Sequence, residues 1–193
     1  MSRLVARDVY RLGDRDVSWW LVVDDGAATL VDAGLPAQLG QLTMLLAAPD
    51  LRVADIAAVL VTHGHADHFG CVAALRAAAP DLDVHLPRAD RALAAKRPGV
   101  EPKVLANSFR RAAVRTALSY ARQGMLSVRP LVDALDLDDG DVLDVPGRPR
   151  FVHAPGHTPG SGMFVFADRD VVCSGDALGI VLPGHGEPWF RRP

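Results

Sequence analysis

Short apolar runs separated by turn-forming residues occur towards both ends of this chain, and they predict β-strands. The residues between the runs include glycine, proline and aspartate, which are typical of turns. The run at 57–61 is apolar throughout, as expected for a strand buried on both faces of a sheet. The predicted strands are residues 4–10, 19–23, 28–31, 57–61, 84–86, 142–145, 150–153, 163–167 and 171–173.

Apolar residues at helical spacing predict helices between these strands, at residues 36–48, 69–79 and 88–123. In the first helix, Leu39 and Leu42 fall on one face, and the second helix stops at Pro80. The third is rich in alanine and arginine and is broken near Pro98. Strands interleaved with helices, followed by further strands, favour a layered α/β or α+β fold. We interpret residues 1–193 as a single domain.

Composition limits the classes of function that remain. The chain has 193 residues, of which 49% are hydrophobic and 23% charged, and its formal net charge is -2. These values are typical of a globular domain and give no electrostatic reason to expect nucleic-acid binding. The sequence has no apolar run of the roughly 18–20 residues that span a bilayer, and charge appears too early for a signal peptide. Two cysteines cannot form a disulfide framework. We therefore expect a cytoplasmic protein with no nucleic-acid or membrane partner, which could form a homodimer.

The strongest chemical signal is a cluster of potential metal ligands directly after the predicted strand 57–61. It contains His63, His65, Asp67 and His68 within six residues. On a helix, residues two apart point to nearly opposite sides, so His63 and His65 could not share an ion there. In an extended turn they project together, and Gly64 gives that turn its backbone freedom. Asp67 and His68 lie further round the turn and suit a second ion.

Three later segments repeat this order of apolar strand, glycine-containing turn and candidate ligand. They lead to His157, Asp176 and His185. Ligand sites of α/β folds lie where the ends of strands meet, so these side chains are expected at one edge of the structure. Imidazole and carboxylate groups are ligands of catalytic zinc, which keeps one coordination position open for water. The sequence therefore predicts a metal centre.

The same segments resemble a known family. Residues 62–68, 156–161, 174–176 and 183–186 are similar, in order and in strand context, to the successive motifs of the metallo-β-lactamase-fold hydrolases. The resemblance covers nearly the whole chain. It implies an α+β fold, namely a four-layer αββα sandwich with the metal ions at one edge of two facing sheets. It also implies that residues 88–123 form a helical insertion covering the active site.

Position by position, the resemblance implies two zinc ions. Asp176 would bridge them, and Asp32 would support the histidine turn by hydrogen bonds. Asp67 would also be catalytic, by orienting the nucleophile or relaying its proton. The first ion would be held by His63, His65 and His157, and the second by Asp67, His68 and His185.

Two such cations would acidify a water molecule, and the resulting hydroxide attacks a carbonyl carbon. The resemblance thus implies a zinc-dependent hydrolase of a small ester, thioester, lactone or related amide. Residues 156–161 and 174–178 are similar to the glyoxalase-II-like branch of thioester hydrolases. A mononuclear iron persulfide dioxygenase of the same fold would use His63, His157 and Asp176. A metal-bound module without catalysis is the third interpretation, and metal content together with hydrolysis separates the three.

The interval between Asp176 and His185 is short for this interpretation. Only residues 177–184 separate the two ligands. If both follow strands at the same edge, those strands are parallel, and a parallel connection needs roughly a dozen residues or more. Either the protein contains a segment between Asp176 and His185 that the printed sequence lacks, which is the interpretation we favour, or His185 reaches the site by an unusual route. An intact mass well above that of the printed chain is the expected result.

Overall fold

The larger of two β-sheets has seven strands, which follow one another in chain order from edge to edge. The computed structural model describes residues 3–47, 50–98 and 111–178. Strand pairs from β1 to β4 are antiparallel, and those from β4 to β7 are parallel. The strands are β1 (Arg3–Ala6), β2 (Val9–Gly13), β3 (Ser18–Asp24), β4 (Ala27–Val31), β5 (Ile56–Leu60), β6 (Asp83–Pro87) and β7 (Leu135–Leu137).

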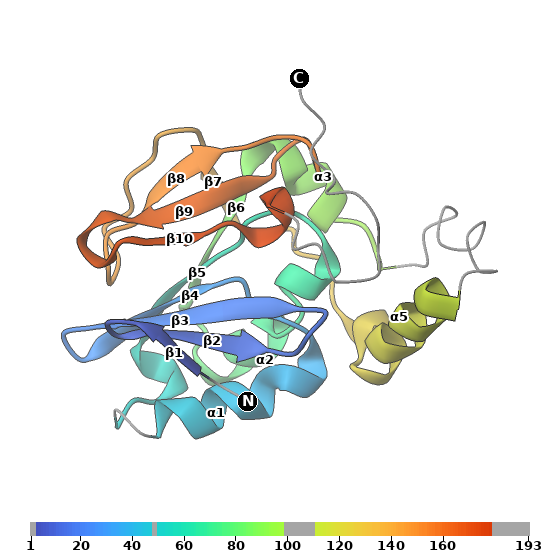
Figure 1. Cartoon of the computed structure of the whole chain (residues 1–193), viewed down its shortest axis with the longest axis horizontal. Helices are drawn as coiled ribbons and strands as arrows, with labels where there is room; N and C mark the ends of the chain where they lie inside the picture. The colour runs from blue at the N-terminus through green and yellow to red at the C-terminus, as the bar shows by residue number, and fades with distance from the viewer. Residues whose placement is uncertain (1–2, 48–49, 99–110, 179–193) are drawn as a thin grey trace.

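A smaller antiparallel sheet lies against one face of the seven-stranded sheet (Figure 1). Its strands are β8 (Arg150–His153), β9 (Gly162–Phe166) and β10 (Val171–Cys173), with β9 in the centre. Helices α1 (Leu39–Leu46) and α2 (Val72–Ala78) cover the opposite face of the larger sheet. The described elements therefore form an α+β sandwich with helix, sheet and sheet layers in that order.

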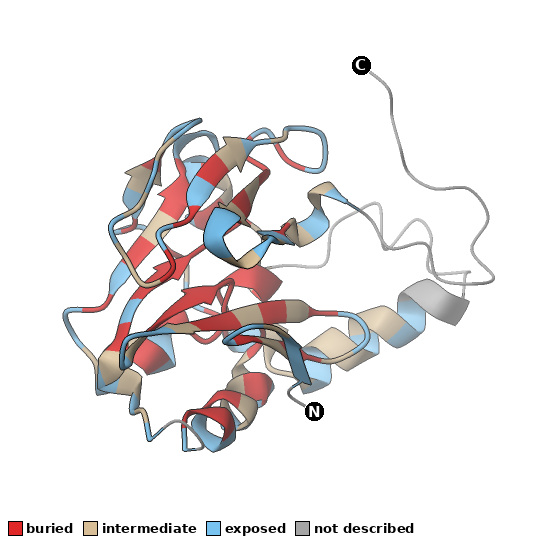
Figure 2. Cartoon of the chain, turned by 60° about the vertical axis from the view of Figure 1, so that its left-hand side comes forward, coloured by how far each residue is buried: buried red, intermediate tan, exposed pale blue. Residues whose placement is uncertain are grey.

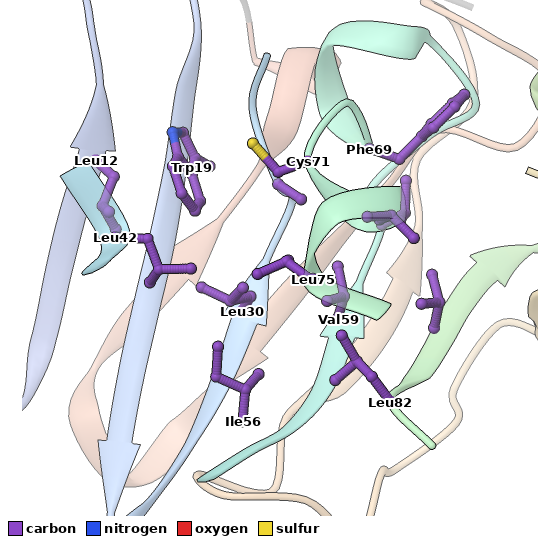
Figure 3. Close-up of a cluster of buried hydrophobic side chains, with 14 of the residues drawn as sticks. Leu12, Trp19, Leu30, Leu42, Ile56, Val59, Phe69, Cys71, Leu75 and Leu82 are labelled. Carbon is purple, nitrogen blue, oxygen red and sulfur yellow. The ribbon is translucent and has the colours of Figure 1, made fainter. Parts of the chain in front are cut away.

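One apolar core lies between the larger sheet and its helices. Trp19, Leu30 and Val59 project from neighbouring strands towards this side and are completely buried. Leu42 of α1 and Leu75 of α2 pack against them, as Figure 3 shows. The helical spacing of the leucines in residues 36–48 predicted one apolar helix face, and that face of α1 is the one buried against the sheet.

A second apolar core lies between the two sheets. Val31 and Leu60, from β4 and β5, meet Phe151, Phe164 and Phe166 of the smaller sheet. Alternate residues of β9 are buried, and Figure 2 shows buried residues along the facing sheets. Because β4 and β5 contribute to both cores, their apolar side chains are covered on both faces, which explains the continuous apolar run at 57–61.

Two strand predictions are wrong. Residues 4–10 do not form one strand, because the chain turns at Asp8, whose φ is 55°, and continues as β2. Residues 142–145 contain no strand, and Val142 makes only an isolated bridge with Arg150. Strand β7 was not predicted, because three residues are too few to show a period and its pairing with β6 defines it.

The segment 88–123 is helical in the two parts that the structure describes. These are α3 (Arg91–Ala94) and α5 (Arg111–Arg122), while residues 99–110 lie outside the described residues. The end of α5 is attached beside α1, because the Ala37 N–H donates to the Gln123 carbonyl at 3.1 Å. The side-chain amide of Gln38 also donates to Gln123 Oε1 at 2.8 Å. None of the helices in the described ranges is long and apolar enough to cross a membrane.

Candidate metal centre

The histidine turn begins where β5 ends and is held by a buried carboxylate. Asp32 follows β4 directly and is completely buried. It accepts hydrogen bonds from the Thr62 N–H at 2.8 Å and from the Thr62 hydroxyl at 2.9 Å. It also contacts His68 Nδ1 at 2.9 Å. Asp32 therefore supports this turn, as the sequence predicted, by joining its first residue to its last.

The contact with Asp32 sets the chemistry of the His68 ring. Because the carboxylate accepts the Nδ1 proton, Nε2 is the nitrogen available to a metal ion. Nε2 lies 3.7 Å from Asp67 Oδ2 and 3.5 Å from Asp176 Oδ1. Burial alone lowers the pKa of His68, but the Asp32 and Asp67 carboxylates outweigh it and raise the pKa to about 10. Without metal the ring therefore carries a proton on Nε2 as well, and a metal ion that binds there must displace it.

Three other imidazoles converge on a common point. His65 Nδ1 lies 3.1 Å from His63 Nε2 and 3.0 Å from His157 Nε2. The three rings are almost mutually perpendicular, at 82°, 88° and 85°. One Nδ1 atom offers either one proton or one lone pair, so ordinary hydrogen bonds cannot satisfy both close contacts. A cation at the centre would satisfy all three nitrogens.

The spacing of these nitrogens fits zinc. With Zn–N bonds of about 2.0–2.1 Å, a tetrahedral site separates its ligand nitrogens by about 3.3 Å. Burial, together with the neighbouring imidazoles, lowers the pKa of both His63 and His65 below the ordinary value for histidine. The rings are therefore neutral at pH 7 and present lone pairs, as metal binding requires. Thr62 Oγ1, 3.2 Å from His63 Nδ1, leaves Nε2 of His63 facing the centre.

A second group of candidate ligands shares His63 with the first. It consists of His63, His68 and Asp176, whose ligand atoms lie within 4.8 Å of one another. Asp176 Oδ2 is also 3.4 Å from His157 Nε2, so one carboxylate contacts a histidine of each group. This is the placement that a bridging ligand needs. The carboxylate side chain is 47% exposed, so this side of the centre is accessible to solvent.

A second buried carboxylate joins the two loops that carry His65 and His157. Asp90, completely buried at the end of the turn after β6, accepts the Gly64 N–H at 2.8 Å. It also accepts the Gly160 N–H at 2.8 Å and the Thr158 hydroxyl at 2.6 Å. A Cβ atom on Gly160 would lie 2.6 Å from Asp90 Cγ, so this approach needs glycine.

The sequence analysis did not identify Asp90 as a site residue. Its position shortly after β6 is a signal that could have found it, because ligands of parallel sheets lie beyond the carboxyl ends of the strands. The helical interpretation of residues 88–123 hid this signal.

Tyr120, in α5, is a further contact that the sequence analysis missed. Its hydroxyl donates to Asp67 Oδ2 at 3.1 Å. Burial and the Asp67 and Asp176 carboxylates raise the pKa of this phenol well above its usual value, so it remains a donor. Part of the segment 88–123 therefore reaches the metal centre.

Comparison with known proteins places this arrangement in a family. The model of the metallo-β-lactamase superfamily matches residues 12–192. The chain belongs to this superfamily. The order of its motifs and its α+β fold are those expected of a metallo-β-lactamase-fold protein, and the family predicted from the sequence is confirmed.

Individual relatives in the superfamily carry different names. The hydroxyacylglutathione hydrolase of Xylella fastidiosa (strain M12) is 29% identical over 166 residues, which cover 86% of this chain and 46% of the relative. The atrochrysone carboxyl ACP thioesterase of Aspergillus chevalieri is 28% identical over 170 residues, covering 86% and 40%. This chain thus spans about half the length, or less, of the curated relatives that it matches.

Solved metallo-β-lactamases share the fold. One from Cronobacter sakazakii, with a HARLDQ motif, is 24% identical with a TM-score of 0.63, covering 85% of this chain and 58% of its own. A subclass B3 enzyme of Bradyrhizobium japonicum is 21% identical with a TM-score of 0.59, covering 84% and 54%.

The predicted ligands that the structure describes lie near one another, and all of them except Asp67 belong to one of the two groups. His63, His65 and His157 form the first group, and His68 lies with Asp176 in the second. Asp67 lies beside His68 rather than within either group of mutually close ligand atoms. His185 lies outside the described residues, and so does most of the interval between it and Asp176. Its role as a ligand stays a prediction, as does the missing segment.

Proposed function

We propose that this chain carries the active site of a hydrolase that uses two zinc ions to cleave a small ester, thioester, lactone or related amide. The observation that carries the proposal is the convergence of three imidazole nitrogens on one point, with Asp176 beside them. The distances match tetrahedral zinc, and the contacts are ones that hydrogen bonds alone cannot satisfy. When bound, the two ions would acidify water and polarise the carbonyl group.

Each residue of the centre has a role in this proposal. Asp176 lies between the two groups of ligands. Asp67 is the catalytic residue that orients the attacking water or accepts its proton. His63, His65 and His157 would hold the first ion, and Asp67, His68 and His185 would hold the second.

A thioester is the substrate that the relatives favour. One of them is named as a hydrolase of hydroxyacylglutathione and another as a thioesterase, each similar over 86% of this chain. A small molecule is also consistent with the exposed side of the centre at Asp176. The attack would then produce a carboxylic acid and a thiol, with the thiolate as the leaving group.

The first test is the metal content of purified protein that has not met a chelator. We expect about two zinc ions per chain and hydrolysis of at least one member of a panel of thioesters, esters and lactones. About one iron per chain, with consumption of oxygen and no hydrolysis, would establish the dioxygenase alternative instead. Bound metal without either reaction would establish a non-catalytic module.

A pair of variants tests the ligand assignment. His65→Ala is expected to abolish both zinc retention and turnover. His85→Ala is the matched control, because His85 lies in β6, is half-buried and belongs to neither group of ligands. Full activity of His65→Ala with zinc present would refute the assignment.

A further inference from the structure

Tyr120 links a helix outside the sandwich to the metal centre. It lies near the end of α5, and its ring packs against the core between the larger sheet and the helices. Its hydroxyl is 3.1 Å from Asp67 Oδ2 and donates to it. The two residues are 53 positions apart in the chain, so the contact is a tertiary one. Of the two tyrosines in the sequence, Tyr120 is the one with this contact.

The contact determines how the Asp67 carboxylate is oriented. Asp67 Oδ2 faces both the phenol and His68 Nε2, which is 3.7 Å away. A hydrogen-bond donor favours one orientation of a carboxylate, and the Tyr120 hydroxyl is such a donor. With the hydroxyl in place, Oδ2 stays on the side of the second ligand group.

The same helix has another attachment that does not involve a candidate ligand. The side chain of Gln38 donates to Gln123 Oε1 at 2.8 Å, next to the end of α5. The Gln123 side-chain amide in turn donates to Ser119 Oγ within the helix. Gln123 therefore ties α5 to the body, whereas Tyr120 ties it to the metal centre. The two attachments can be removed separately.

We propose that Tyr120 is a positioning residue that holds the Asp67 carboxylate for the second metal ion and thereby couples occupancy of that site to the docking of α5. Coupling of this kind is reciprocal: if docking of the helix favours the ion, the ion favours docking of the helix by the same factor. The inference rests on the proposed two-metal function. It adds that α5, through Tyr120, controls the second site and not the first.

The test is a zinc titration of four proteins by competition with a chelator. Tyr120→Phe removes the hydroxyl and keeps the ring. We expect it to weaken the second zinc ion about 10-fold, a typical effect of removing a hydrogen-bond partner of a ligand, while the first ion is unchanged. Tyr10→Phe controls for the loss of a phenol elsewhere. Gln123→Ala loosens α5 but keeps the Tyr120 hydroxyl, so it is expected to weaken the second ion less than Tyr120→Phe does.

Hydrogen exchange of the amides in residues 114–122 gives a second readout. Addition of the second zinc equivalent is expected to slow exchange in α5 of the original protein and to have less effect in Tyr120→Phe. In the metal-free protein, Tyr120→Phe and Asp67→Ala are each expected to accelerate this exchange. Their double variant should exchange no faster than the faster single variant, because both remove the same contact.

Two results would overturn the proposal. One is a Tyr120→Phe protein that binds the second ion as tightly as Tyr10→Phe. The other is a Gln123→Ala protein that loses as much zinc affinity as Tyr120→Phe, because the effect would then be simple packing of α5. Failure of the proposed function is distinguishable, since the original protein itself would then lack two zinc ions and hydrolysis.

Discussion

Asp32 and Asp90 are both completely buried carboxylates, but they support the two ligand groups in different ways. Asp32 contacts a ligand itself, since it binds the ring of His68 and selects which nitrogen faces the metal. The hydrogen bonds that Asp90 accepts in the described structure do not come from the ligand side chains of the first group. It accepts backbone N–H groups from the loops of His65 and His157 and so fixes the distance between those loops.

The second ligand group is thus supported by a contact with a ligand side chain, and the first by hydrogen bonds to the backbone of its loops. In the second group, the His68 ring is deeply buried against Asp32. In the first group, His157 is 36% exposed and depends on the loop that Asp90 holds. We therefore expect the second group to contribute more to folding and the first group to depend more on bound metal.

The largest expected effect separates His68 from His157 in the metal-free protein. His68→Ala leaves the buried Asp32 carboxylate without its imidazole partner, and we expect a loss of about 3–5 kcal/mol in the free energy of unfolding. His157→Ala removes an exposed side chain, and we expect a loss of less than about 1 kcal/mol. Urea unfolding with a chelator present measures both. Equal losses would show that the two groups do not differ in their structural role.

Asp90→Ala is expected to cost about 3 kcal/mol, because it leaves two buried N–H groups without an acceptor and removes one of the two partners of the Thr158 hydroxyl. Asp90→Asn keeps one acceptor oxygen, so its loss should be smaller. Both variants should weaken the first zinc ion more than the second, since the N–H groups that Asp90 accepts lie beside His65 and in the loop of His157. Urea unfolding and zinc competition measure the two quantities. Weakening of the second ion alone would contradict the division of roles.

Removal of metal should increase the mobility of the loop of the first ligand group more than that of the second. Zinc at a free concentration 100-fold above its dissociation constant stabilises a one-site protein by about 2.7 kcal/mol, and chelation removes this contribution. Amide hydrogen exchange is expected to accelerate more in residues 156–161 than in residues 66–69, which Asp32 continues to hold. The opposite order would mean that the metal, rather than Asp32, organises the histidine turn.

The smallest expected effect concerns Thr62, whose hydroxyl lies between the two groups. It donates to Asp32 and lies 3.2 Å from His63 Nδ1 and 3.4 Å from His68 Nδ1. Thr62→Val keeps the shape but loses the hydroxyl, so we expect a loss of about 1 kcal/mol. Thr62→Ser retains the hydroxyl and should lose less. Thermal unfolding of both variants gives the order, and a valine variant as stable as serine would remove Thr62 from the network.

Short-range sequence patterns were sufficient to predict those parts of the molecule in which a single strand and the turn after it determine the structure. The run at 57–61 and the ligands that follow it were found because a buried strand and a glycine-containing turn are both visible over a few residues. Asp32 was expected from the resemblance to the metallo-β-lactamase-fold family rather than from a local pattern. The prediction of one strand at 4–10 failed because the turn at Asp8 uses an aspartate in a left-handed conformation, where pattern alone favours continuation.

The sequence by itself determined which chemical groups the centre contains, the order in which they occur and the strands that carry several of them. Only the tertiary structure decided that Asp90 joins the loops of His65 and His157 and that Tyr120 reaches Asp67. These contacts connect residues 26 to 70 positions apart. The physical reason is that a hydrogen bond depends on a distance of about 3 Å between two groups in space, and hydrophobic periodicity along a chain records only which face of an element is buried.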